Sequence, residues 1–137
     1  MRFASLRADT GLERALGPVH SNIAERTDVR LDDPWRSRGH TVVDLGDDVF
    51  TRGRPHPMID HRLRNERLVA EARDPSVAVI LFDLVLGHGA HPDPANAMLP
   101  AIGAAKSVAA KAKRPLALVG FVCGTAADPQ SLTRQET

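Results

Sequence analysis

The sequence predicts an α/β fold in three layers, with a short parallel sheet and flanking helices. Two aliphatic runs, VAVILFDLVL at 77–86 and LALVGFV at 116–122, are typical of strands buried on both faces, as in parallel sheets covered by helices. Between them, apolar residues recur at steps of four and three from Met98 to Ala112, which indicates a helix. A strand, a helix and a strand in this order form a right-handed unit with parallel strands.

A third strand of the same sheet is predicted at 40–45, where HTVVDL is short, β-branched and followed by Gly46. A polar loop leads from there to Pro57, which suits the first turn of a helix. This helix is expected from about Ile59 to Arg73, because Asp74 and Pro75 then stop it.

The later helix is expected to begin near Asn96 rather than at Pro94, because Pro100 cannot donate a backbone hydrogen bond to the preceding turn. Pro115 ends this helix. After the last strand, Asp128 and Pro129 open a short final helix.

Residues 1–38 are predicted to form an irregular N-terminal arm, and residues 39–137 the α/β domain. The arm mixes charges with turn formers and has one short helix around 12–16. Trp35 is expected to anchor the end of the arm by packing.

Composition narrows the class of protein. Eighteen basic residues stand against 17 acidic ones, so a net charge of +1 gives no field for nucleic acid or an anionic membrane. Cys123 is the only cysteine, which excludes an internal disulfide. The first residues lack the apolar run of a signal peptide, and no stretch is long enough to span a bilayer. We therefore expect a cytoplasmic protein.

Ligands of an open parallel sheet bind beyond the carboxyl ends of its strands. The first of three loops expected there contains Gly46, Arg52, Arg54 and His56, just before a helix whose free N–H groups favour an anion. These residues predict a phosphate or carboxylate site. The alternative is a solvated loop held by its own Arg–Asp pairs. Asp47 and Asp48 would repel a phosphate, so we expect them to point away from it or to pair with the arginines.

The second loop, GHGAHPDP, contains Gly87, His88, Gly89, His91 and Asp93. The imidazoles and the carboxylate could bind a divalent metal or supply a general acid and base. Their spacing matches no metalloenzyme pattern such as HExxH, so no metal is predicted. The two glycines indicate close approach of the backbone to another group, and a ligand is one candidate.

The third loop contributes Cys123, Gly124 and Thr125 to the predicted substrate-binding residues. A thiol at a strand end could be a nucleophile if its pKa were lowered, but a buried structural cysteine is the commoner outcome. Asp83 interrupts an apolar strand, so its carboxylate requires backbone N–H groups or a nearby arginine. Asp83, His88 and His91 are the candidate catalytic residues, and no role is assigned to any of them.

The segment from Leu16 to Thr137 closely resembles the C-terminal part of FdrA proteins, which are similar to succinyl-CoA synthetase within the acyl-CoA synthetase superfamily. The resemblance is carried by LGPVHSN, DPWRSRGHTVVDLGDD, RGRPHPMID, VILFDLVLGHGAHPDPA and CGTAADPQSLTRQ. It implies a flavodoxin-like CoA-ligase-type domain over 39–137, truncated before the family's last helix and strand. It also implies that the helix after Pro57 faces a phosphorylated histidine, with Gly46 where a glycine-rich loop would be.

The resemblance further implies a ligase-like activity on an anionic acyl or phosphoryl group. CoA, a nucleotide or phosphate would be ligands, and Mg²⁺ could accompany them. A phosphohistidine segment, a CoA-binding Rossmann domain and an ATP-grasp domain are not in this sequence, so we expect action with partner subunits or as a homo-oligomer. Two alternatives are a carbamoyltransferase component in purine or allantoin breakdown and a non-catalytic assembly module. A third is a metal-dependent hydrolase using His88, His91 and Asp93.

Overall fold

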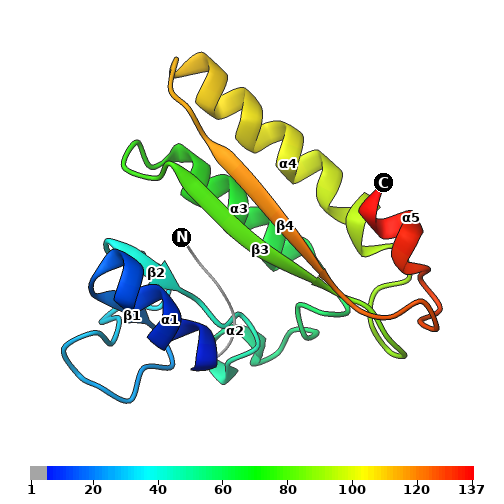
Figure 1. Cartoon of the computed structure of the whole chain (residues 1–137), viewed down its shortest axis with the longest axis horizontal. Helices are drawn as coiled ribbons and strands as arrows, with labels where there is room; N and C mark the ends of the chain where they lie inside the picture. The colour runs from blue at the N-terminus through cyan, green and yellow to red at the C-terminus, as the bar shows by residue number, and fades with distance from the viewer. Residues whose placement is uncertain (1–5) are drawn as a thin grey trace. The chain divides into compact units, whose positions relative to one another are not determined.

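The computed structural model describes the backbone from residue 6 to residue 137 and the side chains from residue 11 onward. The chain divides between Arg54 and Pro55 into two compact units (Figure 1). Each unit has its own two-stranded parallel sheet.

The first unit contains helix α1 (Leu6–Leu16), strands β1 (Val19–Ser21) and β2 (His40–Val42), and the short helix α2 (Asp48–Thr51). The two strands pair in parallel. Val19 and Val42 of these strands are buried, together with Val29 and Leu31 from the segment between the strands and Phe50 from α2. Trp35 packs edge-on against Phe50, with 4.8 Å between the ring centroids.

The expectation of one sheet with three strands is wrong. Strand β2 pairs with β1 in the first unit, whereas the strands of the second unit pair only with each other within the described residues. The physical reason is that the arm offers a partner strand: β1 pairs with β2 along its whole length. On its other side β1 is held by backbone hydrogen bonds from Ser21 to Val29 and from Leu31 to Ser21. The arm expected to be irregular therefore carries α1 and β1, and the short helix expected around 12–16 is the last part of α1.

The second unit contains helix α3 (Arg62–Arg73), strand β3 (Val79–Val85), helix α4 (Pro94–Lys111), strand β4 (Ala117–Cys123) and helix α5 (Leu132–Glu136). Strands β3 and β4 are parallel, with Val79 opposite Ala117 and Val85 opposite Cys123. The α/β class, with short parallel sheets and flanking helices, is thus confirmed.

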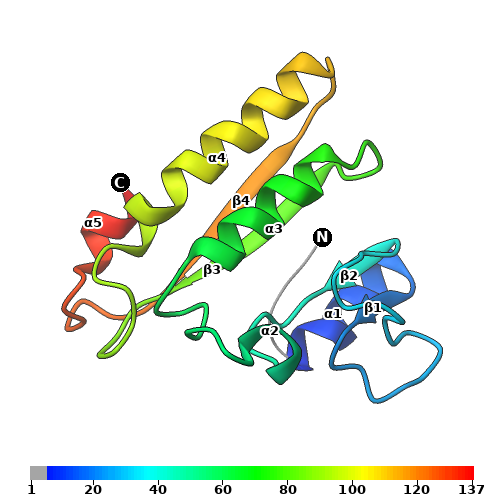
Figure 2. The ribbon, with the colours of Figure 1, turned by 180° about the vertical axis from the view of Figure 1, so that it is seen from behind.

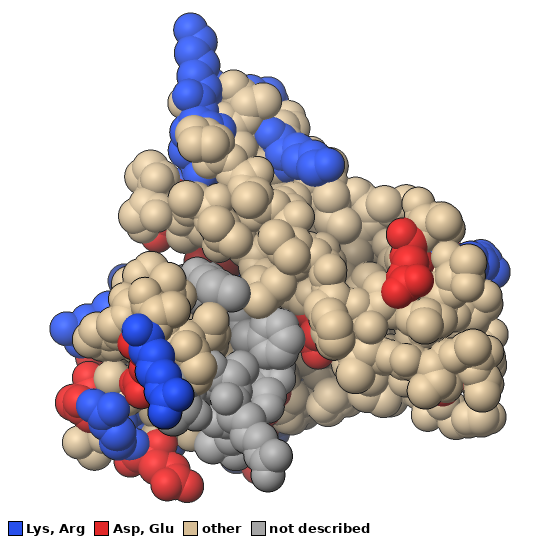
Figure 3. Space-filling model, viewed as in Figure 1, with Lys and Arg blue, Asp and Glu red and all other residues tan. Residues whose placement is uncertain are grey.

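Both long helices of the second unit lie on one face of its sheet, as Figures 1 and 2 show from opposite sides. The core between them is formed by Leu68, Ala72, Ile80, Leu84, Met98, Ala101 and Ala105. Three layers were expected, but this unit has two, a sheet and one layer of helices. The reason is that two parallel strands need only one crossover helix, α4, and α3 packs beside α4 on the same face. On the opposite face, Val119 and Phe121 are 46% and 53% exposed. The surface over β3 and β4 is mainly uncharged in this view (Figure 3).

Three helix starts differ from those expected. Helix α5 begins at Leu132, not at Asp128 and Pro129, because the carbonyl of Asp128 accepts from Ser131 in a separate turn. Helix α3 begins at Arg62, not near Ile59, because the carbonyl of His56 accepts from Ile59 and Asp60 in a separate turn. Helix α4 begins at Pro94, where proline is favourable because the first turn needs no donor there. The helix continues through Pro100 despite the missing N–H.

Arg114 fastens the far end of the second unit. Its guanidinium donates to the carbonyl of Val77 at 2.6 Å and to the carbonyl of Ala72. It therefore ties the segment between α4 and β4 to α3, through Ala72, and to the segment before β3, through Val77. Among the helices of residues 6–137, none combines the length and the apolar character needed to cross a bilayer.

Replacing Gly124 with alanine should destabilise the second unit by about 1–3 kcal/mol, because overpacking a filled space forces side chains and backbone to move. A Cβ at Gly124 would lie 2.7 Å from the Cβ of the buried Leu86. Gly103, in α4, is the matched control because a Cβ there meets nothing within 4 Å. Gly103→Ala should stabilise the helix by roughly 0.5–1 kcal/mol. Urea unfolding measures both, and equal effects would contradict the packing argument.

Candidate functional site

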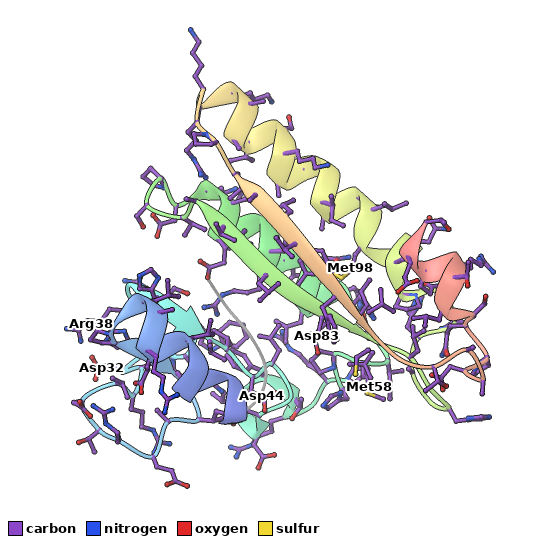
Figure 4. All side chains as sticks on the ribbon, in the orientation of Figure 1. Asp32, Arg38, Asp44, Met58, Asp83 and Met98 are labelled. Carbon is purple, nitrogen blue, oxygen red and sulfur yellow. The ribbon has the colours of Figure 1, made fainter. Side chains whose placement is uncertain are left out.

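The candidate site lies at the carboxyl ends of β3 and β4, which are adjacent because the strands are parallel and in register. Three segments are joined there by hydrogen bonds. The His91 backbone N–H donates to the Met58 carbonyl at 2.8 Å, which ties loop 87–93 to the turn before α3. Gln130 joins the same loop to the segment after β4. Met58 and Asp83 lie toward this end of the unit (Figure 4).

Asp83 has the arginine partner that its place in an apolar strand requires. Arg64, from the first turn of α3, donates one guanidinium nitrogen to the Asp83 carboxylate and another to the Asp83 backbone carbonyl. Their side chains are 15% and 21% exposed, so the pair is largely shielded from water. Because this pairing neutralises Asp83, the carboxylate is not a free base in this arrangement. A catalytic role for Asp83 stays a prediction.

The start of α3 gathers polar atoms whose hydrogen-bonding capacity is unused. Among the described residues, His61 Nδ1, Arg64 Nε and Asn65 Oδ1 are buried without a hydrogen-bond partner. His61 is the residue preceding the helix and makes no side-chain capping bond. Asn65 uses its other group to donate to the Ala97 carbonyl of α4 at 2.8 Å. Leaving a buried polar atom unpaired costs about 1–3 kcal/mol, so such atoms gathered at one helix start can serve binding.

His61 packs against His91 from the second loop. The ring centroids are 5.1 Å apart and the rings are tilted by 59°. Burial lowers the pKa of His61 to about 4, and the Arg64 cation and His91 act in the same direction, against the carboxylates of Asp60 and Asp83. His61 is therefore neutral at neutral pH and can donate or accept one hydrogen bond at Nδ1, depending on its tautomer.

Asp60, two residues before α3, contacts the first residue of this helix. Its carboxylate accepts from the Arg62 backbone N–H at 3.0 Å and pairs with the Arg62 guanidinium. The hydrogen bond from the Arg62 side chain lowers the pKa of Asp60 to about 2. Asp60 is thus ionised and occupied at neutral pH, and it supplies an acceptor for one free N–H of the helix start.

Loop 87–93 is held by two glutamines that are each 5% exposed. Gln130 accepts from the Gly87 N–H and donates to the carbonyls of Gly87 and His91. Gln135 accepts from the Ala95 N–H at the start of α4 and donates to Asp93. These contacts fix a loop that has no strand or helix of its own.

The three residues considered as metal ligands have separate environments. His88 is exposed, and His91 accepts the Asp93 backbone N–H at Nδ1. Asp93 pairs with Arg134 at 2.7 Å, and the hydrogen bond from Gln135 lowers the pKa of its carboxyl group. In the part of the chain that the structure describes, no three His, Cys, Asp or Glu side chains gather as a metal site. The geometry therefore gives the metal interpretation no support.

The glycines predicted to bind substrate occupy positions where the local structure favours glycine. Gly87 and Gly89 adopt φ of +134° and +83°, in the region where other residues are strained. Gly124 leaves the space that the Leu86 side chain occupies. A Cβ at Gly87 or Gly89 would meet nothing closer than the Asp128 carboxylate at 3.9 Å from Gly87, so the close approach inferred for these two glycines has no partner among the described residues. Binding of a substrate by these glycines stays a prediction.

The third loop is satisfied by its own residues. Thr125 donates its backbone N–H and its hydroxyl to the Asp128 carboxylate, at 2.6 and 3.2 Å. Cys123 is exposed at the end of β4, so the interpretation as a buried structural cysteine is wrong. The reason is that its side chain lies on the face of the sheet that the helices of this unit leave open.

The loop before Pro55 belongs to the first unit. Gly46 donates to the Asp44 carboxylate at 2.8 Å, while Arg52 is exposed and Arg54 lies 5.9 Å from the Trp35 ring. Asp47 accepts from Val49 and caps α2. It also accepts from the buried Asn22 at 3.3 Å, so its partners are an amide and a backbone N–H and not the arginines; that it points away from an anion stays a prediction.

His56 belongs to the second unit, where its Nδ1 accepts from the Met58 N–H at 3.1 Å. The expected anion site joined Gly46, Arg52 and Arg54 with His56. The structure assigns the first three to one compact unit and His56 to the other.

Comparison with known proteins identifies the family. A model of the CoA-ligase family matches residues 12–137, which is most of the chain. The chain belongs to the CoA-ligase family. It is 50% identical over 119 residues to the uncharacterized protein YahF of Escherichia coli (strain K12). That alignment covers 87% of this chain and 23% of YahF, so the chain spans about a quarter of that relative.

Residues that sequence reasoning did not single out make most of the contacts of this CoA-ligase domain. Arg64 was signalled indirectly, by the need of Asp83 for a partner. His61, Arg64 and Asn65 are spaced so that they share one side of a helix start, but the expected start at Ile59 placed them inside the helix. Gln130 and Gln135 had no sequence signal, because their partners are about 40 residues away.

Acidification should destabilise the domain through His61. The unfolded side chain titrates near pH 6.5 and the folded one near 4, so between these values the unfolded state binds more protons. The free energy of unfolding should therefore fall as the pH drops from 6.5 to 4, with a full loss of roughly 3 kcal/mol.

Urea unfolding at a series of pH values checks this expectation. His61→Phe, which cannot be protonated, should flatten the slope in this interval. His88→Phe, a change at an exposed histidine, is the control for the loss of one imidazole. An identical slope in the wild type and in His61→Phe would contradict the assignment.

Proposed function

We propose that this chain is an FdrA-like domain of the acyl-CoA synthetase superfamily that binds an anionic acyl or phosphoryl group and acts with other subunits or domains. Membership of the CoA-ligase family supports a ligase-type role. The observation that carries the proposal is the start of α3, where polar groups without partners are buried beside the positive end of a 12-residue helix.

The donors at this helix start suit a small anionic group. Helix N-termini bind anions through free backbone N–H groups and the helix dipole. Arg64 adds an unused Nε–H, although Asp83 already neutralises its charge. Binding would therefore depend on directed hydrogen bonds more than on net charge, and moderate affinity is expected.

The wider ligand would need other parts of an assembly. The atoms at the start of α3 fit a carboxylate or a phosphoryl group, and they do not by themselves make a site for a nucleotide base. CoA, a nucleotide and any Mg²⁺ that accompanies its phosphates would thus be held largely by partner domains. The much greater length of YahF is compatible with such an arrangement in this family.

Calorimetry with inorganic phosphate, succinate, CoA and Mg–ATP tests the proposal, and carbamoyl phosphate with oxamate tests the carbamoyl-transfer alternative. Phosphate should bind with millimolar affinity. Arg64→Lys keeps a cation for Asp83 but removes the Nε–H donor, so it should weaken binding about tenfold, as expected for a lost hydrogen bond to a charged group.

Arg62→Lys is the matched control, since Arg62 is exposed and forms an ion pair with Asp60. It should change the dissociation constant less than about twofold, in line with the small contribution of exposed ion pairs. If none of the ligands binds, or if both lysine variants weaken binding equally, the proposed site is wrong.

An assembly function is the second candidate, and the open face of β3 and β4 favours it. Parallel sheets are almost always covered on both faces, whereas here Val119 and Phe121 remain about half exposed. A second copy of the chain, presenting the same apolar face, is the occupant we propose.

Val119→Lys should convert such an oligomer to a monomer in sedimentation equilibrium, because it places a charge in the apolar contact opposite Leu81, whereas Phe121 lies opposite Asp83. Leu99→Lys is the control, since Leu99 is also exposed but lies on α4. A wild-type chain that is monomeric at every concentration would exclude self-assembly through this face.

A further inference from the structure

We propose that Gln130 is a positioning residue for the site at the start of α3, and that it acts by fixing His91 against His61. This inference rests on the proposed function for its meaning, but its test does not require a ligand. It assigns a role to Gln130, in the segment after β4, where sequence reasoning singled out only Cys123, Gly124 and Thr125.

The side-chain amide of Gln130 uses both its oxygen and its nitrogen in hydrogen bonds to loop 87–93. Its Oε1 accepts from the Gly87 N–H at 3.1 Å, and its Nε2 donates to the carbonyls of Gly87 at 2.8 Å and His91 at 3.2 Å. The side-chain amide thus pairs with the loop as a neighbouring strand would. Because Gln130 is 5% exposed, water competes little for these bonds.

His91 connects loop 87–93 to the start of α3. The carbonyl of His91 is held by Gln130, and its N–H is held by the Met58 carbonyl at 2.8 Å. With the backbone fixed on both sides, the His91 ring packs on the His61 ring. A chain of direct contacts therefore runs from Gln130 through His91 to His61.

The backbone is strained directly after Gln130. Ser131, directly after Gln130, has φ of +59°, which is rare for a residue with a side chain. The turn allows Gln130 and Gln135 both to be buried, and Gln135 donates to the Gln130 carbonyl at 3.3 Å. Strain of this kind persists where the surrounding contacts over-determine the conformation.

The charges around His61 make its titration a suitable reporter. It faces Arg64 on α3, His91 on the loop before α4, Asp60 on the turn before α3 and Asp83 on β3. Burial is the largest cause of its lowered pKa, so a displaced His91 ring would admit water and raise that pKa. A role of Gln130 in stability alone would leave the titration unchanged.

The experiment is an NMR titration of the histidine ring signals in the full chain. Gln130→Met keeps the length of the side chain but removes all three hydrogen bonds, and the pKa of His61 should rise from about 4 toward 6.5. Arg114→Met is the matched control, because it removes hydrogen bonds at the other end of the same unit. It should leave the pKa of His61 in place even if it lowers stability as much.

Two outcomes would overturn the proposal: an unchanged His61 titration in Gln130→Met, or an equal change in Arg114→Met. Hydrogen exchange on the wild type gives a test that needs no variant. The amide protons of Gly87 and His91 should exchange with one shared opening free energy, and independent exchange would also overturn the proposal.

Phosphate binding separates this inference from the function on which it rests. If phosphate binds, Gln130→Met should weaken it about fivefold or more, while Arg114→Met should not. If phosphate does not bind at all but the His61 titration moves as expected, the proposed ligand is wrong and the positioning by Gln130 stands. If phosphate binds the wild type and Gln130→Met equally, the positioning role fails and the proposed function survives.

Discussion

The ion pair between Arg64 and Asp83 is the interaction on which the arrangement of the second unit depends. A carboxylate in the middle of an apolar strand cannot remain charged and buried without a cation. The cation comes from the first turn of α3, and the second guanidinium contact is to the backbone carbonyl of Asp83 itself. This double contact fixes where α3 starts along β3. Removal of either partner would leave a charge that the remaining contacts do not satisfy.

Because the start of α3 is held in this place, the positions of the other polar side chains near it are also determined. His61 precedes the helix and Asn65 lies one turn further, where it reaches the carbonyl of Ala97. The loop from β3 to α4 must then pass next to this helix start, and it is held there by Gln130 and Gln135. The result is a region where side-chain amides replace the missing backbone pairing, while His61, Arg64 and Asn65 each keep one unused polar atom.

Sequence reasoning succeeded where a residue's own surroundings determine its structure. The apolar runs predicted β3 and β4, Pro75 predicted the end of α3, and the buried Asp83 predicted an arginine. It also predicted a strand at 40–45, where β2 lies, but it missed β1 and placed β2 in the wrong sheet, because a three-residue strand has no readable periodicity and the pairing depends on a segment about 20 residues away. The loop contacts could not be predicted for the same reason. Gln130 bonds to Gly87 across more than 40 residues, and a glutamine in a sequence carries no sign that its side chain is buried.

The two faces of the β3–β4 sheet differ in a way that bears on how such a domain works. One face is closed by α3 and α4 over an aliphatic core, and the other keeps Val119 and Phe121 in solvent. A parallel sheet in this state has buried only part of the apolar area that its strands offer, which limits the stability of the isolated unit. Asp83 is the register partner of Phe121, so its side chain lies on this open face together with Val119 and Cys123. A partner on this face would therefore add apolar burial and would also lie next to the Arg64–Asp83 pair at the start of α3. Association and ligand binding would then be coupled through this ion pair.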